Sequence, residues 1–318
     1  MNLNEKDQNG TYCFGIDVGG TTIKCGLFEA RGQLIDKWEL PTHTENNGRA
    51  ILPDTAAAIA AKMKEQKLSH SDICGVGIGI PGPVNETGEV PAAVNLHWGY
   101  VHIVKEMQSL TGLKVKAAND ANAAALGEMW KGGGAGYQNV CLVTLGTGVG
   151  GGMVHNGKIV VGSHGGAGEL GHIHVSDSIS KQCNCGNYGC LEQVASATGI
   201  TNLAKSYLQA STAPSVLRDA PLSAKAVFDA IKAGDTLAME IGEQFGKYLG
   251  VALAHTASVL DPDIFVIGGG VSKAGTILID YVQKYYTKYA FIPSKDTPFA
   301  LAQLGNDAGI YGAAKLVC

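Results

Sequence analysis

One short stretch of the chain carries most of the residues that could do chemistry. It supplies one imidazole and three thiols, enough to close a tetrahedral zinc site: His172, Cys183, Cys185 and Cys190. One carboxylate, Glu169, stands just before the histidine, and a second, Glu192, stands just after the last cysteine. A metal site bracketed by two acids indicates that the metal holds polar groups in position for another ligand.

The predicted zinc is structural. Four protein ligands leave no open position, so the metal is not the Lewis acid of a reaction. A redox pair of cysteines is the alternative interpretation of the cluster. Cys13, Cys25, Cys74 and Cys141 lie singly in apolar runs, and Cys318 is the last residue of the sequence. We expect these to be reduced thiols, as in a cytoplasmic protein, and not a disulfide framework.

Glycine is frequent, with 44 residues, and it gathers at the ends of three predicted strands. The clusters are Gly19 with Gly20, the run from Gly146 through Gly148 to Gly152, and Gly268 with Gly269 and Gly270. Backbone N–H groups in such clusters approach a ligand closely and form a nest for anions. The presence of three such clusters favours a role in binding a polyphosphate and its nucleoside. The alternative is that they are ordinary tight turns. Residues 146–151 also match the dinucleotide fingerprint, but that fingerprint requires a helix to follow, and here a strand is predicted.

The spacing of apolar residues predicts an α/β chain. Strands are predicted at 13–18, 23–28, 34–40, 73–80, 115–118, 140–145 and 263–267, and helices at 51–67, 101–110, 119–130, 199–232 and 236–259. The order of strand, glycine-rich turn and strand occurs at 13–28 and again at 140–161. This repetition predicts a duplicated α/β architecture with a cleft between two related halves and a short hinge near 117–118.

Several motifs together resemble the ROK proteins (repressors, uncharacterised frames and sugar kinases) of the actin-like ATPase superfamily. The similar segments are 15–21 (first phosphate motif), 119–122 (catalytic segment), 145–152 (second phosphate motif), 169–172 and 183–192 (sugar and zinc motifs), 267–271 (adenosine segment) and 307–314 (closing helix). The resemblance runs from about residue 13 to 316, and the spacing of the three cysteines before Glu192 is its most specific part.

The resemblance implies the actin-like ATPase (ribonuclease H-like duplicated) α/β fold, with two domains flanking a cleft. Residues 1–118 would form the smaller domain, with the helix 306–318 packing back on it. Residues 119–305 would form the larger domain and carry the zinc loop. The resemblance also implies a homodimer or higher homo-oligomer, ATP as donor and Mg²⁺ as its metal.

The implied activity is ATP-dependent phosphorylation of a hexose at its 6-hydroxyl. Segments 95–98 and 130–132 resemble the glucose-phosphorylating branch of the family, and Ala167-Gly168 stands where fructose-phosphorylating members carry His-Pro. We therefore expect glucose to be the substrate. An N-acetylmannosamine kinase and a catalytically silent sugar-binding regulator are the alternatives.

The resemblance also implies roles for single residues. Asp120 would be the base that accepts the proton of the attacked hydroxyl, the alternative being that Asn119 or Asp120 only caps the helix that follows. Asp17 would help to place Mg²⁺ through a water molecule, and the alternative is a carboxylate that stabilises the turn. Thr21 and Thr147 would offer hydroxyls to phosphate oxygens.

The sugar would be held by residues from two motifs. Hydrogen bonds to its hydroxyls are implied for Asn119, Asp120, Glu169, His172 and Glu192. Carboxylates accepting from hydroxyls form charge-assisted bonds that orient a ligand strongly. His172 would bind zinc through one ring nitrogen and face the sugar with the other; the alternative is a zinc ligand only.

Bulk properties exclude several other classes. Hydrophobic residues make up 45% and charged residues 16%, which excludes wholesale disorder. The net charge is −4 with no basic run, which argues against a nucleic-acid surface. No stretch reaches the roughly 18 apolar residues of a membrane helix. Residues 1–12 are polar, so we expect no signal peptide, and they are too few for the helix-turn-helix domain of the repressor members.

Overall fold

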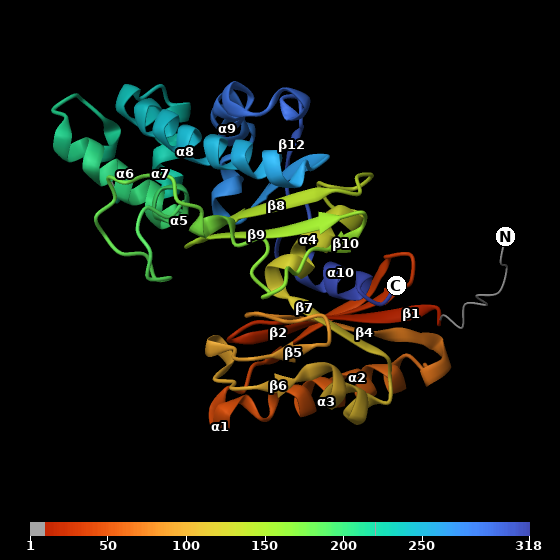
Figure 1. The fold of residues 1–318 in the computed structure, drawn as a ribbon. Coiled ribbons are helices and arrows are strands. Elements are labelled where there is room, and N and C mark those ends of the chain that lie inside the picture. Colours follow the sequence, from red (N-terminus) through yellow and green to blue (C-terminus); the bar gives the residue numbers. More distant parts are fainter. Residues whose placement is uncertain (1–9, 220) are drawn as a thin grey trace. The chain divides into compact units, whose positions relative to one another are not determined.

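The computed structural model describes residues 10–219 and 221–318 (Figure 1). The chain divides into two compact units. Unit 1 runs to Gly132 and includes Lys158–Ala167 and Asn306–Cys318, whereas unit 2 is Gly133–Gly157 with Gly168–Gly305. The expected absence of a signal peptide concerns mainly residues 1–9, which lie outside the described residues.

The sheet of unit 1 carries the first glycine turn. Its strands are β1 (Tyr12–Val18), β2 (Thr22–Glu29), β3 (Leu34–Pro41), β4 (Ile73–Ile80) and β7 (Val115–Asn119), in the order β3-β2-β1-β4-β7. β1, β2 and β3 pair antiparallel, and β4 and β7 run parallel to β1. Every residue of β4 is buried, as expected of a parallel strand covered on both faces.

Helices cover both faces of this sheet (Figure 1). α2 (Ile51–Glu65) and α3 (Ile103–Thr111) lie on one face, and α4 (Asp120–Lys131) and α10 (Ala308–Lys315) lie on the other. α1 (Glu45–Gly48) is a single turn, and β5 (Glu89–Val90) pairs with β6 (Val101–His102). The predicted helix at 101–110 therefore begins two residues late, because its first residues form β6.

The sheet of unit 2 repeats this topology. Its strands are β8 (Val140–Leu145), β9 (Val149–His155), β10 (Lys158–Ile159), β11 (Ile264–Gly268) and β12 (Phe299–Leu301), in the order β10-β9-β8-β11-β12. Of these, β10 falls in the segment Lys158–Ala167 that is grouped with unit 1, and the other four belong to unit 2. β8 and β9 form an antiparallel hairpin, and β11 and β12 run parallel to β8. The duplicated α/β architecture predicted from the two glycine-tipped hairpins is confirmed.

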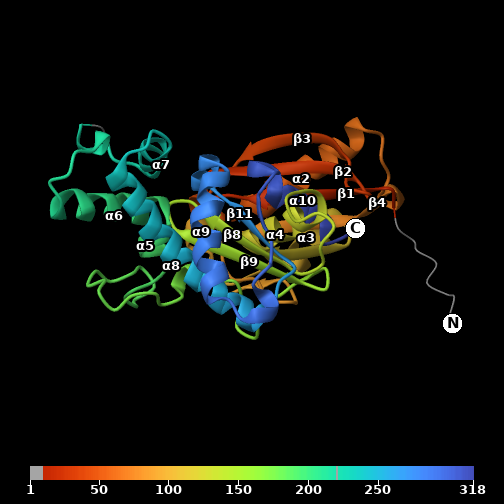
Figure 2. The same cartoon turned by 90° about the horizontal axis from the view of Figure 1, so that it is seen from above.

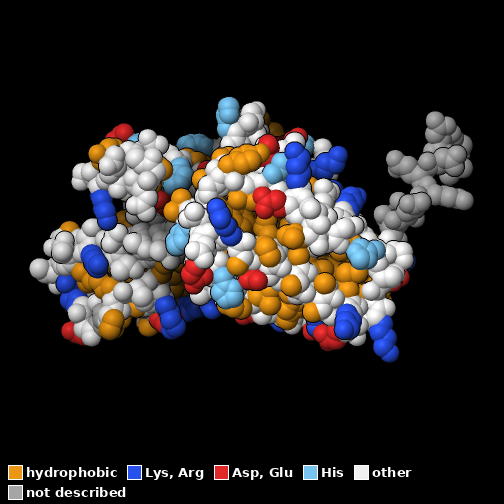
Figure 3. All heavy atoms as spheres, turned by 90° about the horizontal axis from the view of Figure 1, so that it is seen from below, with side chains coloured by type: hydrophobic (Ala, Val, Ile, Leu, Met, Phe, Trp, Pro, Cys, Tyr) orange, Lys and Arg blue, Asp and Glu red, His pale blue; other side chains and the backbone are white. Residues whose placement is uncertain are grey.

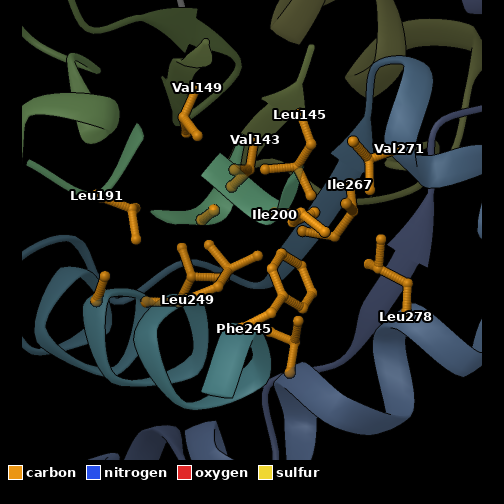
Figure 4. Packing of buried hydrophobic residues seen from close by; sticks show 14 of the residues in the cluster. Val143, Leu145, Val149, Leu191, Ile200, Phe245, Leu249, Ile267, Val271 and Leu278 are labelled. Carbon is orange, nitrogen blue, oxygen red and sulfur yellow. The ribbon is translucent and has the colours of Figure 1, made fainter. Parts of the chain in front are cut away.

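The helices of unit 2 are α5 (Glu192–Ala195), α6 (Ala197–Ala210), α7 (Ala224–Lys232), α8 (Thr236–Leu260) and α9 (Thr276–Tyr289). Figures 1 and 2 show α5, α6 and α7 side by side. The core joins them to the sheet: in Figure 4, Ile200 of α6 and Phe245 and Leu249 of α8 point toward Val143 and Leu145 of β8.

The single long helix predicted at 199–232 is wrong. α6 ends at Ala210, and α7 starts only after Ser223, whose side chain accepts a hydrogen bond from the N–H of Ala226. Pro214 lies between them and disfavours a helical conformation in the residue before it.

The two ends of the described chain meet in unit 1. α10 packs on β1 and β4 so closely that a Cβ at Gly77 would overlap the carbonyl group of Ala313. This brings Cys318 to the start of β1, where it forms a disulfide with Cys13, their Cα atoms lying 6.9 Å apart. The expectation that Cys13 and Cys318 are reduced thiols is therefore wrong in this structure, because the fold joins residues that are far apart in the sequence.

Charged groups are dispersed over the surface that Figure 3 shows. Lys, Arg, Asp and Glu side chains are scattered there among neutral ones, without a large field of one sign. This agrees with the absence of a basic run in the sequence. Within the described part of the chain, no helix has the length and apolar character needed to cross a membrane.

Candidate active site

Unit 1 brings Asp17 and Asp120 together. Asp17 lies near the end of β1, and Asp120 is the first residue of α4, directly after β7. β1, β4 and β7 are parallel, so their carboxyl ends share one edge of the sheet. Burial raises the pKa of Asp17 to about 6, the negative charge of Asp120 adds to this rise, and Lys24 opposes it. Two carboxylates that repel each other in this way form a candidate cation site.

A close approach of α10 fixes the Asp17 carboxylate. A Cβ at Gly309, in the first turn of α10, would lie 2.5 Å from Asp17 Oδ2. On the other side, a Cβ at Gly79 of β4 would lie 3.6 Å from Oδ1. The carboxylate is therefore held between a helix and a strand. The sequence places Gly309 in the closing-helix motif but does not show that it faces Asp17.

Asn119 takes the capping role at the start of α4. Its Oδ1 accepts hydrogen bonds from the backbone N–H groups of Ala121 and Asn122 at 3.0 and 3.1 Å, and its Nδ2 donates to the carbonyl of Gly82. Asp120 Oδ1 also accepts from the N–H of Ala121 at 2.8 Å. Asn119 is therefore the N-cap of α4, and helix capping does not account for the carboxylate of Asp120.

The three glycine clusters lie where two strands turn or end. Gly19 and Gly20 lie between β1 and β2 beside exposed Thr21, and Gly146–Gly148 lie between β8 and β9 with exposed Thr147. Gly268 ends β11, Gly269 has a φ of +83°, and Gly270 starts a 3₁₀ turn. Since β9 and no helix follows Gly146–Gly148, the dinucleotide fingerprint is excluded.

The predicted zinc ligands of unit 2 converge. The ligand atoms of His172, Cys183, Cys185 and Cys190 all lie within 4.8 Å of one another. Cys185 Sγ is 3.6 Å from Cys190 Sγ, and Cys183 Sγ is 3.8 Å from His172 Nδ1. Tetrahedral zinc, with bonds of about 2.3 Å to sulfur and 2.0–2.1 Å to nitrogen, places its ligands about 3.5–3.8 Å apart. The donor set and its spacing fit zinc.

His172 lies between this cluster and the two acids. Its Nδ1 faces Cys183 and lies 4.0 Å from Glu192 Oε1, while its Nε2 lies 3.9 Å from Glu169 Oε2. Glu192 Oε1 also accepts a hydrogen bond from Cys183 Sγ at 3.0 Å. The imidazole therefore turns one nitrogen to the thiols and the other toward Glu169.

The glycine turn between β8 and β9 packs against the carboxylate of Glu192. A Cβ at Gly148 would lie 2.7 Å from Glu192 Oε2, so the lack of a side chain at 148 lets that carboxylate approach the turn. The N–H of Ala197, at the start of α6, also donates to the carbonyl of Gly146 at 2.8 Å. Glycine in this turn therefore serves packing against Glu192, and the N–H of Gly146 donates within the turn to the carbonyl of Gly148 at 3.0 Å.

Two side chains that the sequence did not single out hold the cysteine-bearing loop. His174 Nδ1 lies 2.9 Å from the carbonyl of Tyr188, and its Nε2 lies 3.0 Å from Asp177 Oδ1. Gln193 Nε2 donates to the carbonyl of Lys181, and its Oε1 accepts from the N–H of Cys190. For His174, alternation with His172 along the chain indicates only that it points elsewhere, and nothing in the local sequence identifies its partners.

The duplicated sheet, the paired carboxylates and the thiol cluster define an actin-like α/β protein with the residue set of a phosphotransferase. A family model described as "ROK family" matches residues 13–318. The chain therefore belongs to the ROK family.

Curated relatives and solved structures agree with this assignment. The chain is 44% identical to a glucokinase of Halalkalibacterium halodurans over 95% of this chain and 94% of the relative. It is 36% identical to a glucokinase of Streptomyces coelicolor over 95% and 96%. A ROK family glucokinase from Streptomyces griseus, solved with glucose and AMPPNP, matches with a TM-score of 0.72 and 33% identity, covering 96% of this chain and 98% of that one.

Proposed function

We propose that this chain is an ATP-dependent glucokinase, which transfers the γ-phosphoryl group of ATP to the 6-hydroxyl of glucose. The observation that carries this proposal is the 44% identity to a glucokinase over 95% of the chain. The convergence of the predicted site residues within each unit supports it. The Streptomyces griseus relative, solved with glucose and an ATP analogue, supports the choice of both substrates.

The proposed chemistry needs one base and charge neutralisation. Asp120 accepts the proton of the 6-hydroxyl, whose oxygen forms a bond to the γ-phosphorus while the bond to the ADP oxygen breaks. Asp17 would hold Mg²⁺, and the bound metal would supply neutralisation of the charge on the phosphates. The backbone N–H groups of the three glycine clusters and the hydroxyls of Thr21 and Thr147 bind phosphate oxygens and the nucleoside.

The proposed sugar contacts are hydrogen bonds from five side chains to the sugar hydroxyls, namely those of Asn119, Asp120, Glu169, His172 and Glu192. His172 and the three cysteines would hold zinc, which would supply a rigid anchor for this set. Because four protein ligands complete a structural zinc site, its contribution is to orient His172 and the loop before Glu192.

The alternatives that the sequence left open receive less support. The relatives at 44% and 36% identity are both glucokinases, which favours glucose over N-acetylmannosamine. Asp120 and the intact glycine clusters argue against a silent regulator. We also propose a domain boundary near 118 and again near 305, a homodimer and a cytoplasmic location. In a reducing cytoplasm, the Cys13–Cys318 disulfide would be present as two thiols.

A coupled assay of ADP formation over a panel of sugars tests the function. Glucose, mannose, fructose, N-acetylglucosamine and N-acetylmannosamine are compared with and without Mg²⁺. We expect the highest kcat/KM for glucose and no turnover without Mg²⁺. Higher activity on N-acetylmannosamine would replace the proposed substrate, and the absence of sugar-dependent ADP formation would favour the regulator.

A further inference from the structure

One lysine of the sheet of unit 1 lies beside the carboxylate of Asp17. β1 and β2 pair antiparallel, and Asp17 of β1 stands directly opposite Lys24 of β2. Residues directly opposite each other in an antiparallel pair place their side chains on the same face, with Cβ atoms about 4.5–5.5 Å apart. Lys24 therefore shares a face of the sheet with the carboxylate to which the proposed reaction assigns Mg²⁺.

α10 packs on this same face. A Cβ at Gly15, two residues before Asp17, would overlap the carbonyl of Ile310 in α10. A Cβ at Gly26, two residues after Lys24, would lie 3.2 Å from Ile310 Cδ1. Residues two apart in a strand share a face, so the side chains of Asp17 and Lys24 lie on the α10 side of the sheet.

The start of α10 depends on contacts from the sheet. Asp307, the residue before the helix, makes no capping hydrogen bond through its side chain. Lys24 Nζ donates to the carbonyl of Asn306 at 3.1 Å, and Lys37 Nζ of β3 forms an ion pair with Asp307 Oδ2 at 2.8 Å. The Lys37 side chain is 58% exposed, and exposed ion pairs contribute little to stability. Lys24 is half-buried and is therefore the stronger of the two anchors.

A short series of contacts joins Lys24 to Asp17 through α10. Asn306, whose carbonyl Lys24 holds, precedes Gly309 by three residues, which is about one helical turn. A Cβ at Gly309 would lie 2.5 Å from Asp17 Oδ2, so the backbone of this turn lies against the carboxylate. A shift of the first turn of α10 would therefore change the space that is left for Asp17.

We propose that Lys24 is a positioning residue for the phosphoryl transfer, because its hydrogen bond to Asn306 fixes the turn of α10 that in turn fixes Asp17. The inference rests on the proposed function, since it takes Asp17 to serve that transfer. In this role Lys24 touches no reacting atom. A lysine that bound an ATP phosphate directly would instead contribute to the affinity for ATP, so the two roles differ in their kinetics.

Lys24→Met tests the role in the full-length enzyme, because it removes the ammonium group and keeps an unbranched side chain. We expect kcat to fall about five- to tenfold, since small displacements at a reacting site are costly, with the KM values for glucose and ATP within about twofold of wild type. Lys24→Arg retains a cationic donor for the carbonyl, so its kcat should stay within about threefold of wild type.

Hydrogen exchange without nucleotide or metal gives a second readout, independent of activity. The amides of 311–313 bond to carbonyls four residues earlier, in and just before the first turn of α10, so they report opening of that turn. They should exchange at least about threefold faster in Lys24→Met than in wild type. Lys105→Met is the matched control, because Lys105 of α3 is exposed and makes no hydrogen bond or ion pair with other described residues. It should change neither the kinetics nor the exchange.

The outcomes separate this role from its alternatives. Wild-type kcat in Lys24→Met, or a lower kcat without faster exchange, would refute positioning through α10. A raised KM for ATP at unchanged kcat would also refute it and assign Lys24 to phosphate binding. If Lys24→Arg were as impaired as Lys24→Met, the hydrogen bond to Asn306 would not be the cause. Wild-type protein that does not phosphorylate glucose would refute the proposed function, and this role with it.

Discussion

The two units position their carboxylates by different means. In unit 1, Asp17 is held by backbone: β4 and the first turn of α10 approach it where glycines leave room. In unit 2, Glu192 is held by side chains, accepting a hydrogen bond from Cys183 within a cluster of thiols. A side chain packed between a helix and a sheet can move little, whereas the position of a loop residue depends on the side-chain contacts that hold the loop. We therefore propose that Asp17 and Asp120 of unit 1 serve chiefly the chemistry and that Glu192 of unit 2 serves chiefly recognition of the sugar.

The largest expected effect is that of Asp120→Asn. This change keeps the size of the side chain but removes the proposed base. We expect kcat to fall about 10²–10⁴-fold, the range for loss of general-base catalysis. Steady-state kinetics measures kcat, and a thermal melt that matches wild type controls for folding. A variant with near wild-type turnover would remove Asp120 from the proposed role.

Gly309→Ala tests whether the backbone of α10 positions Asp17. The new Cβ would lie 2.5 Å from Oδ2, so the carboxylate must move. We expect kcat to fall about ten- to a hundredfold, since small displacements in a catalytic site have effects of this size, together with a higher Mg²⁺ requirement. Gly99→Ala is the matched control, because a Cβ there meets nothing within 4 Å. Equal activity of the two variants would contradict positioning by α10.

A smaller effect is expected from Gly148→Ala in unit 2. Its Cβ would lie 2.7 Å from Glu192 Oε2 and displace that carboxylate. If Glu192 serves recognition, the KM for glucose should rise about tenfold, equivalent to the loss of one charge-assisted hydrogen bond, while kcat changes little. A loss of kcat at unchanged KM for glucose would contradict the proposal that Glu192 serves recognition of the sugar.

The proposed zinc of unit 2 should affect recognition of glucose more than turnover. Cys183→Ser should weaken zinc binding, measured as metal content by mass spectrometry, and raise the KM for glucose before it affects kcat. The physical reason is that the loop before Glu192 loses its anchor. Wild-type glucose kinetics in protein verified to be metal-free would show that zinc does not organise this site.

The smallest effect is a pH dependence from Asp17. Its pKa is raised to about 6, so kcat/KM should fall as the pH drops through about 6 and the carboxylate becomes protonated, with bound Mg²⁺ shifting this limb to lower pH. For folding the sign is opposite: the raised pKa contributes stability that is fully present below the unfolded value of 3.8 and lost as the pH rises through about 6. Asp17→Asn should remove this component from urea unfolding measured across that window. An unchanged difference between wild type and variant from pH 4 to 7 would contradict it.

The sequence predicts the repeated elements well. β4 and β8 have their predicted bounds, because each is an apolar run with turn residues after it. β5 and β6 were missed, since strands of two residues show no periodicity. The break between α6 and α7 was missed as well, although Pro214 and Ser223 are local signals for it.

The residues of the candidate site could be predicted from the sequence, but the contacts that position them could not. The zinc cluster follows from the types and spacing of its ligands, which lie close together in the sequence. Contacts such as Gly309 with Asp17 and Cys13 with Cys318 join residues almost 300 or more positions apart, and no local pattern encodes them. Long-range packing decides these contacts, so only the folded chain reveals them.

Glucose affinity of two variants tests the division of roles most directly. Calorimetry without nucleotide compares Asp120→Asn of unit 1 with Glu192→Gln of unit 2. We expect a Kd for Asp120→Asn within about threefold of wild type and a Kd for Glu192→Gln at least about tenfold weaker, because only Glu192 is proposed to serve chiefly recognition. Equal loss of affinity in both variants, or tight binding by Glu192→Gln, would contradict it.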